Sequence, residues 1–282
     1  MITPNIGIYE KALPNLPDWS ARLGAAAEAG YGFIELAVDE DSDRISRLDW
    51  PESARTELRK RAEAAGVSID TVILSVHRRY PLGSSSSDTR RKANAQFEKA
   101  IALARDIGAK TVQVAGYFVY YEDHTERARE WFLEGLRKGA DLAGQAGIML
   151  GLETMDGEDV TSVTQAMDVI AAINSPVLQI YPDIGNLAAN GLDVCRELSA
   201  GRGHLIGIHL KDARPGEYRR VPFGNGIVPF ADAFRTLKEI GYDGNFLIEM
   251  WNDREDDALS VIRGAREWIL ERMTEADFGI DG

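Results

Sequence analysis

The sequence predicts an α/β protein whose residues 1–282 form one (β/α)8 barrel domain. Short apolar, β-branched runs alternate with longer segments of helical periodicity along the whole chain, which is typical of βα units around a parallel sheet. Eight such units can be counted, and no glycine-rich dinucleotide-binding or P-loop motif follows any run. Eight units favour a closed barrel over an open doubly wound sheet, and 282 residues suit a fold of about 250.

The eight expected strands follow one another in chain order. The segments between them carry apolar residues at helical spacing, as in Trp19 to Ala29 and Arg90 to Ile107. The strands are expected near Ile6 to Glu10, Phe33 to Val38, Ile69 to Val76, Thr111 to Tyr117, Ile148 to Met155, Leu178 to Ile184, Leu205 to Lys211 and Phe246 to Trp251.

Glycines mark the junctions between helices and strands. Four helical segments end in Gly shortly before a new apolar run, in "EAGYGFIEL", "AAGVSIDTV", "DIGAKTVQV" and "QAGIMLGLE", where Gly can take the left-handed conformation and let the chain reverse. The polar tract "GSSSSDT" (Gly83 to Thr89) predicts a loop that ends in the N-cap of the next helix. No Pro/Ser-rich linker divides the chain, so no domain boundary is expected.

Composition excludes several classes of function. The net charge of -13 argues against nucleic acid and anionic membranes as partners, because nucleic-acid binders carry basic patches on basic domains. Cys195 is the only cysteine, so no internal disulfide and no multi-thiolate metal site can form. Met1 to Pro14 contains neither a secretory leader nor an apolar stretch long enough to span a bilayer. We therefore expect a cytoplasmic protein.

Four potential metal ligands stand at the ends of the last four expected strands. They are Glu153 in "GLETMD", Asp183 in "IYPDIGN", His209 in "GIHLKD" and Glu249 in "LIEMW". The C-terminal ends of barrel strands converge on one mouth, so these side chains should meet there. Any one of them alone would be equally well explained as a helix cap or a solvated charge. All four at consecutive strand ends favour a shared site.

A divalent cation would relieve the repulsion among three carboxylates brought together at one place. Oxygen-rich ligation with a single imidazole suits one Mg2+ or Mn2+ ion, and Zn2+ or Co2+ is also compatible.

The same segments resemble a known family. The chain is similar to the xylose-isomerase-like TIM barrel superfamily, and within it to the L-ribulose-5-phosphate (L-xylulose-5-phosphate) 3-epimerases. The motifs that carry the resemblance are "GIYEKALP", "HRRYPLGS", "AGYFVYY", "YPDIGNL", "HLKD", "VPFGNGIVPF" and "LIEMW", which span nearly the whole chain. The resemblance implies that Glu153, Asp183, His209 and Glu249 hold the metal and that the two glutamates are the paired acid/base residues.

Epimerisation at C3 of a ketose phosphate requires removal of the proton beside the C2 carbonyl and its return to the opposite face. Two opposed bases suit this task, with Glu153 on one face and Glu249 on the other, while the metal acts as a Lewis acid. The substrate is then a small sugar phosphate, and relatives suggest a homodimer. Cations at the same mouth could bind the phosphate, and Asn186 could bind a sugar hydroxyl or cap the next helix. The two arginines that end the expected loop "RPGEYRR" could equally be solvated surface charges. The expected substrate-binding residues are Lys11, His77, Arg78, Asn186, Lys211 and Arg220.

Three alternatives remain open on the sequence. An aldose/ketose isomerase or a sugar dehydratase could use the same metal site on a different carbon. An endonuclease of the same superfamily would need more histidines than the four present and a less acidic chain. A sugar-binding protein without turnover gains nothing from paired bases.

Overall fold

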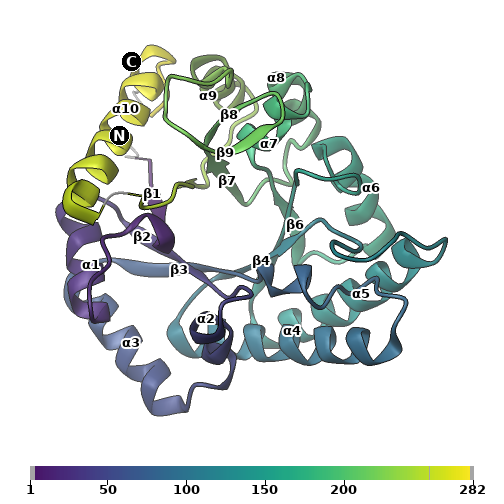
Figure 1. Cartoon of the computed structure of the whole chain (residues 1–282). Helices are drawn as coiled ribbons and strands as arrows, with labels where there is room; N and C mark the ends of the chain where they lie inside the picture. The colour runs from purple at the N-terminus through teal and green to yellow at the C-terminus, as the bar shows by residue number, and fades with distance from the viewer. Residues whose placement is uncertain (1–3, 254, 280–282) are drawn as a thin grey trace.

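The computed structural model describes residues 4–253 and 255–279. Eight parallel strands form a nearly closed barrel with helices around its outside (Figure 1), which confirms the predicted fold. Within the sheet the strands follow the order β6-β5-β4-β3-β2-β1-β10-β7. They are β1 (Ile6–Tyr9), β2 (Phe33–Ala37), β3 (Ser68–Ile73), β4 (Thr111–Ala115), β5 (Met149–Glu153), β6 (Leu178–Tyr181), β7 (Gly207–Leu210) and β10 (Asn245–Ile248).

Helices connect the strands and begin and end where the local sequence favours it. The N-caps include Asp18 before α1 and Ser86 before α4, whose side chains accept backbone N–H bonds, and α3 to α5 end in left-handed glycines. The α-helices are α1 (Trp19–Glu28), α2 (Ser42–Ser46), α3 (Glu52–Ala65), α4 (Ser87–Ile107), α5 (Ala128–Ala146), α6 (Val163–Ile173), α7 (Ile184–Ala189), α8 (Val194–Ala200), α9 (Phe230–Glu239) and α10 (Ala258–Glu275). Short 3-10 turns are η1 (Glu10–Ala12), η2 (Arg47–Asp49), η3 (Ser75–Arg78) and η4 (Glu255–Asp257). Among the described residues no helix is both long and apolar enough to cross a bilayer.

The junction between β6 and β7 has the least backbone pairing of any two neighbouring strands in the barrel. The two strands share only two isolated bridges, Ile180 with Leu205 and Asp183 with His209. The other neighbouring strands pair through ladders of three to five residues. Two of the four predicted metal ligands, Asp183 and His209, therefore lie on opposite sides of this junction.

Large aromatic side chains fill the barrel interior beneath the mouth. The Tyr181 ring lies against β5 and β7 where Gly151 and Gly207 leave space, and a Cβ added at Gly207 would stand 2.3 Å from that ring. Phe33 occupies the equivalent space beside Gly7. These glycines are required by close packing, since interiors at crystal-like density cannot absorb an overlap of that size.

A small hairpin that the sequence did not predict lies at the mouth. The segment "RPGEYRR", expected as a loop, forms β8 (Asp212–Arg214) and β9 (Glu217–Val221), which pair antiparallel beside α7. The Asp212 carboxylate accepts the N–H groups of Gly224 and Gly226 at 2.9 and 2.8 Å and so fixes the segment that follows the hairpin. The hairpin positions two successive arginines at the mouth.

Candidate metal centre and substrate cavity

The four predicted ligands converge at the mouth of the barrel. Glu153 is the last residue of β5, Asp183 precedes α7 as its N-cap, His209 lies in β7 and Glu249 directly follows β10. All four are buried, and one ligand atom from each lies within 4.8 Å of the others. The Nδ1 atom of His209 is 3.3 Å from Glu153 Oε1, 3.8 Å from Glu249 Oε2 and 4.0 Å from Asp183 Oδ2.

The donor set fits a divalent cation. Burial raises the pKa of Asp183 to about 7, although the ammonium of Lys211 opposes the shift. The ionised form of Asp183 is therefore unfavourable unless further positive charge is present. Among the described residues Nδ1 of His209 has no partner in hydrogen-bond geometry, so no protein group competes with an ion for this nitrogen. Three carboxylate oxygens and one imidazole nitrogen match the ligands of Mg2+, Mn2+, Zn2+ or Co2+. The cluster could therefore hold a metal ion.

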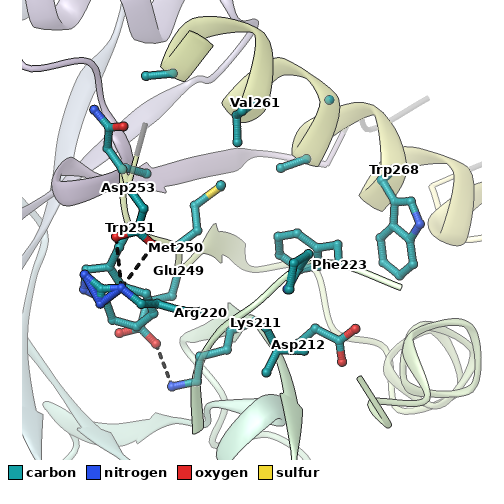
Figure 2. Close-up of a pocket in the computed structure, with 17 residues that line it drawn as sticks. Lys211, Asp212, Arg220, Phe223, Glu249, Met250, Trp251, Asp253, Val261 and Trp268 are labelled. Carbon is teal, nitrogen blue, oxygen red and sulfur yellow. Dashed lines mark hydrogen bonds and ion pairs between the residues drawn. The ribbon is translucent and has the colours of Figure 1, made fainter. Parts of the chain in front are cut away.

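Lys211 supplies the only ammonium among the described side chains in contact with this cluster. Its Nζ lies 2.6 Å from Asp183 Oδ2 and 2.9 Å from Glu249 Oε2, and Figure 2 shows the second contact. Burial alone would raise the pKa of Glu249, but Lys211 and His209 outweigh it and lower the value to about 2. One ammonium does not balance three carboxylates, so the cluster favours a further positive charge.

Glu35 is a further buried acid at this site, and the sequence did not single it out. It lies in β2, is fully buried, and both its carboxylate oxygens are 3.3 Å from Nε2 of His209. Burial raises the pKa of Glu35 to about 7, with His209 acting in the opposite direction. Its position in the middle of a strand, away from the strand end, gave no sequence signal.

A cavity of about 270 Å3 opens beside the cluster and contains four of the predicted substrate-binding residues, namely Lys11, Arg78, Asn186 and Lys211. Lys11 forms an ion pair with Asp39. No carboxylate of the described residues lies within ion-pair distance of Arg78, whose Nε also lacks a hydrogen-bond partner.

The surroundings of Arg78 and Asn186 restrict what each can bind. The Arg78 guanidinium lies over the rings of Tyr117 and Tyr120, at 6.0 and 5.7 Å from their centroids. The Asn186 amide nitrogen donates to the Thr154 carbonyl at 2.9 Å, while its Oδ1 has no partner among the described residues. Asn186 can therefore offer an acceptor to the cavity.

The structure places His77 away from the cavity, contrary to the expectation that it binds substrate. Its Nε2 lies 3.2 Å from the Ala93 carbonyl in α4, and its ring meets Phe97 edge-on at 5.6 Å. Burial lowers the pKa of His77 to about 4, so the ring is neutral. The 3-10 turn η3 is the reason, because it directs His77 to the helix layer and Arg78 to the mouth.

Arg220 also lies elsewhere than predicted, and its neighbour Arg219 takes its place in the cavity. Arg219 lines the cavity and pairs with Asp156 at 2.8 Å. Arg220 has φ +63°, and its Nε contacts both carboxylate oxygens of Asp253 at 3.0 Å (Figure 2). Successive residues of a strand face opposite sides, so an error of one residue exchanges the two roles.

A second, more apolar cavity of about 530 Å3 lies between α10 and the segment after β9 (Figure 2). Phe223, Met250, Val261 and Trp268 line it. It shares Lys211, Glu249 and Trp251 with the first cavity. Trp251 therefore forms part of the wall between the two spaces.

Comparisons with known proteins agree with this architecture. The sequence profile of the xylose isomerase-like TIM barrel family matches residues 23–272. L-ribulose-5-phosphate 3-epimerase UlaE from Escherichia coli (strain SMS-3-5 / SECEC) is 42% identical over 271 residues, which cover 96% of this chain and 95% of that protein. The protein of the same name from Escherichia fergusonii is equally similar, with the same coverage.

Two solved structures share the fold. One, described as the structure of L-ribulose 3-epimerase, superposes with a TM-score of 0.82 at 19% identity and covers 97% of this chain and 96% of its own. The other, D-psicose 3-epimerase in the presence of D-fructose, gives a TM-score of 0.79 at 16% identity and covers 96% and 99%. At these identities the likeness concerns the fold.

Proposed function

The chain belongs to the xylose isomerase-like TIM barrel family, and on this premise we propose that it is a divalent-metal-dependent L-ribulose-5-phosphate 3-epimerase. It would interconvert L-ribulose 5-phosphate and L-xylulose 5-phosphate. The identity of 42% over nearly the whole length of proteins with that name supports the substrate. The observation that carries the chemistry is the buried cluster of Glu153, Asp183, His209 and Glu249.

These four residues would hold one divalent ion, for which we propose Mn2+ or Mg2+, with Zn2+ or Co2+ as alternatives. When bound, such an ion supplies Lewis acidity that stabilises negative charge on the substrate oxygens. The remaining steps belong to the protein's own side chains.

Glu153 and Glu249 would carry the proton. One glutamate removes it from C3, and the other returns a proton to the opposite face of the planar intermediate. Glu249 is in the deprotonated form that a base requires at neutral pH, because Lys211 and His209 outweigh burial and keep its pKa at about 2. Lys211 would compensate charge as the substrate becomes anionic, since its ammonium already contacts Glu249.

The phosphate would bind to the cations of the 270 Å3 cavity. Arg78 is the strongest candidate because it alone among Lys11, Arg78 and Arg219 has no carboxylate partner within ion-pair distance in the described chain. A guanidinium can bind a phosphate through two parallel hydrogen bonds, each charge-assisted and worth about 1.5–3 kcal/mol. Lys11 and Arg219 add positive charge around it.

Deuterium exchange at C3 tests the reaction. Metal-loaded protein incubated with either pentulose phosphate in D2O should interconvert the two and introduce deuterium at C3, as observed by NMR. Glu153→Gln and Glu249→Gln should each abolish this exchange. Glu197→Gln provides a matched control, because Glu197 is also a buried carboxylate but lies in α8 and accepts the backbone N–H of Thr164 in α6, outside the four-residue cluster. Exchange at C1 or C2 would instead indicate an aldose/ketose isomerase, and absence of exchange would refute an enzyme of this class.

A pair of arginine variants tests the phosphate assignment. Arg78→Met should raise KM for the phosphorylated pentulose at least about tenfold, the loss expected for one charge-assisted hydrogen bond, and leave KM for unphosphorylated L-ribulose nearly unchanged. Arg220→Met removes an equal charge one cavity away and should leave both KM values nearly unchanged. Equal effects of the two variants would contradict the assignment.

A homodimer and a cytoplasmic location also remain predictions, and light scattering tests the first.

A further inference from the structure

The imidazole of His209 lies between two groups of carboxylates. Its Nδ1 faces Glu153, Asp183 and Glu249 at the mouth, and its Nε2 faces Glu35 on the inner side. Glu35 belongs to β2, which is not a neighbour of β7 in the sheet, so its side chain reaches His209 through the barrel interior. Both residues are fully buried.

Packing restrains the ring in the same orientation. The Tyr181 ring meets His209 edge-on, with centroids 4.9 Å apart and planes at 72°. Tyr181 itself is seated beside Gly151 and Gly207, where an added Cβ would overlap it. Packing sets the plane of the imidazole, but a plane does not determine which ring nitrogen carries the proton. A hydrogen-bond acceptor is needed for that.

We propose that Glu35 is a positioning residue for the metal site: its carboxylate accepts the Nε2–H of His209 and thereby directs the Nδ1 lone pair to the cation. The inference rests on the proposed metal-dependent function. A carboxylate partner fixes the tautomer of a metal-binding histidine and increases its basicity, which strengthens its bond to the metal.

A purely structural role does not explain an acid at this position. Glu35 is fully buried, and no Lys or Arg of the described chain lies within ion-pair distance of it. Only one of its oxygens has a partner in hydrogen-bond geometry, because Oε1 is unpartnered among the described residues. Burying such a group costs stability that an apolar side chain of similar size would retain. The compensation is therefore expected at the metal site.

Binding of Mn2+ alone tests this role without measuring turnover. Metal-stripped protein is titrated with Mn2+ by calorimetry for the wild type, Glu35→Leu, Glu35→Gln and the remote control Glu197→Gln. Glu35→Leu removes the acceptor and should weaken binding about 10- to 100-fold. Glu35→Gln keeps an oxygen acceptor and should weaken it by a smaller factor, whereas Glu197→Gln should bind as the wild type does.

Nuclear magnetic resonance of the Zn2+-loaded protein supplies a readout that loss of packing would not imitate. The chain has only four histidines, so 15N-histidine labelling gives few signals to assign. In the wild type His209 should show a downfield, slowly exchanging Nε2–H, which should move upfield in Glu35→Gln. The signals of His124 and His204 should stay in place.

The outcomes separate the inference from the proposed function. Wild-type Mn2+ affinity in a folded Glu35→Leu variant, or a proton on Nδ1 of His209 in the Zn2+ form, would overturn the role of Glu35 alone. If the wild type binds no divalent cation, the proposed function fails instead. If Glu35→Leu does not fold, the Nε2–H shift in Glu35→Gln decides, and an unchanged shift counts against the proposal.

Discussion

Acidification should destabilise the protein through His77. The ring is neutral in the folded state, where burial lowers its pKa to about 4, and it donates from Nε2 to the Ala93 carbonyl. In the unfolded chain the pKa is about 6.5, so the unfolded state binds a proton first as the pH falls. Stability is therefore lost between pH 6.5 and pH 4. It is fully present above that window.

The size of the effect follows from the difference between the two pKa values. About 2.5 pH units correspond to about 3.4 kcal/mol below pH 4, of which about 2 kcal/mol is already lost between pH 7 and pH 5. His77→Gln retains an N–H that can reach Ala93 and cannot titrate. The free energy of unfolding in urea, measured for both proteins at pH 7 and pH 5, isolates this contribution because the other acidic groups are common to both.

The variant should therefore lose about 2 kcal/mol less than the wild type over this pH range. Its KM should be unchanged, since the ring faces α4 and not the cavity. If both proteins lose the same free energy, the reasoning that His77 is buried in its neutral form is wrong.

Two further variants, each with a control, test charge and packing at the mouth. Lys211→Met removes a buried ammonium from between two carboxylates and should cost about 3–5 kcal/mol in metal-free protein. Added Mn2+ should raise the thermal stability of Lys211→Met more than it raises that of the wild type. The control Lys99→Met breaks an exposed ion pair and should cost less than about 1 kcal/mol. Gly207→Ala forces a Cβ to 2.3 Å from the Tyr181 ring and should cost about 1–3 kcal/mol by thermal unfolding. Gly24→Ala in α1 meets nothing within 4 Å and should stabilise by up to about 1 kcal/mol; equal effects of the two glycine variants would contradict the packing argument.

The sequence predicted the fold and the meeting of the four potential ligands for the same reason. Strand ends in a barrel converge whatever the details of the helices, so residue type and place in the βα repeat were sufficient. From the sequence, Asp183 could be either a helix cap or a potential metal ligand. In the structure it is both the N-cap of α7 and a member of the cluster. A cap and a ligand were not exclusive explanations.

The errors concern side-chain direction over one or two residues. His77 and Arg78 are adjacent, yet the turn η3 sends one into the helix layer and the other into the cavity. Arg219 and Arg220 exchange places because the hairpin was read as a loop. Glu35 was missed because a polar residue inside a strand is noticeable only when the barrel interior is known. These features depend on tertiary packing and have no local pattern.

The sparse pairing between β6 and β7 would give a bound ion a structural role as well. Asp183 and His209 flank this seam, and their own bridge is one of the two that hold it. An ion bound by both residues would connect the two strands, so closure of the barrel and retention of the ion would become one linked equilibrium. Any fluctuation that separates β6 from β7 would also weaken ion binding, and without an ion this side of the barrel would be the first to open.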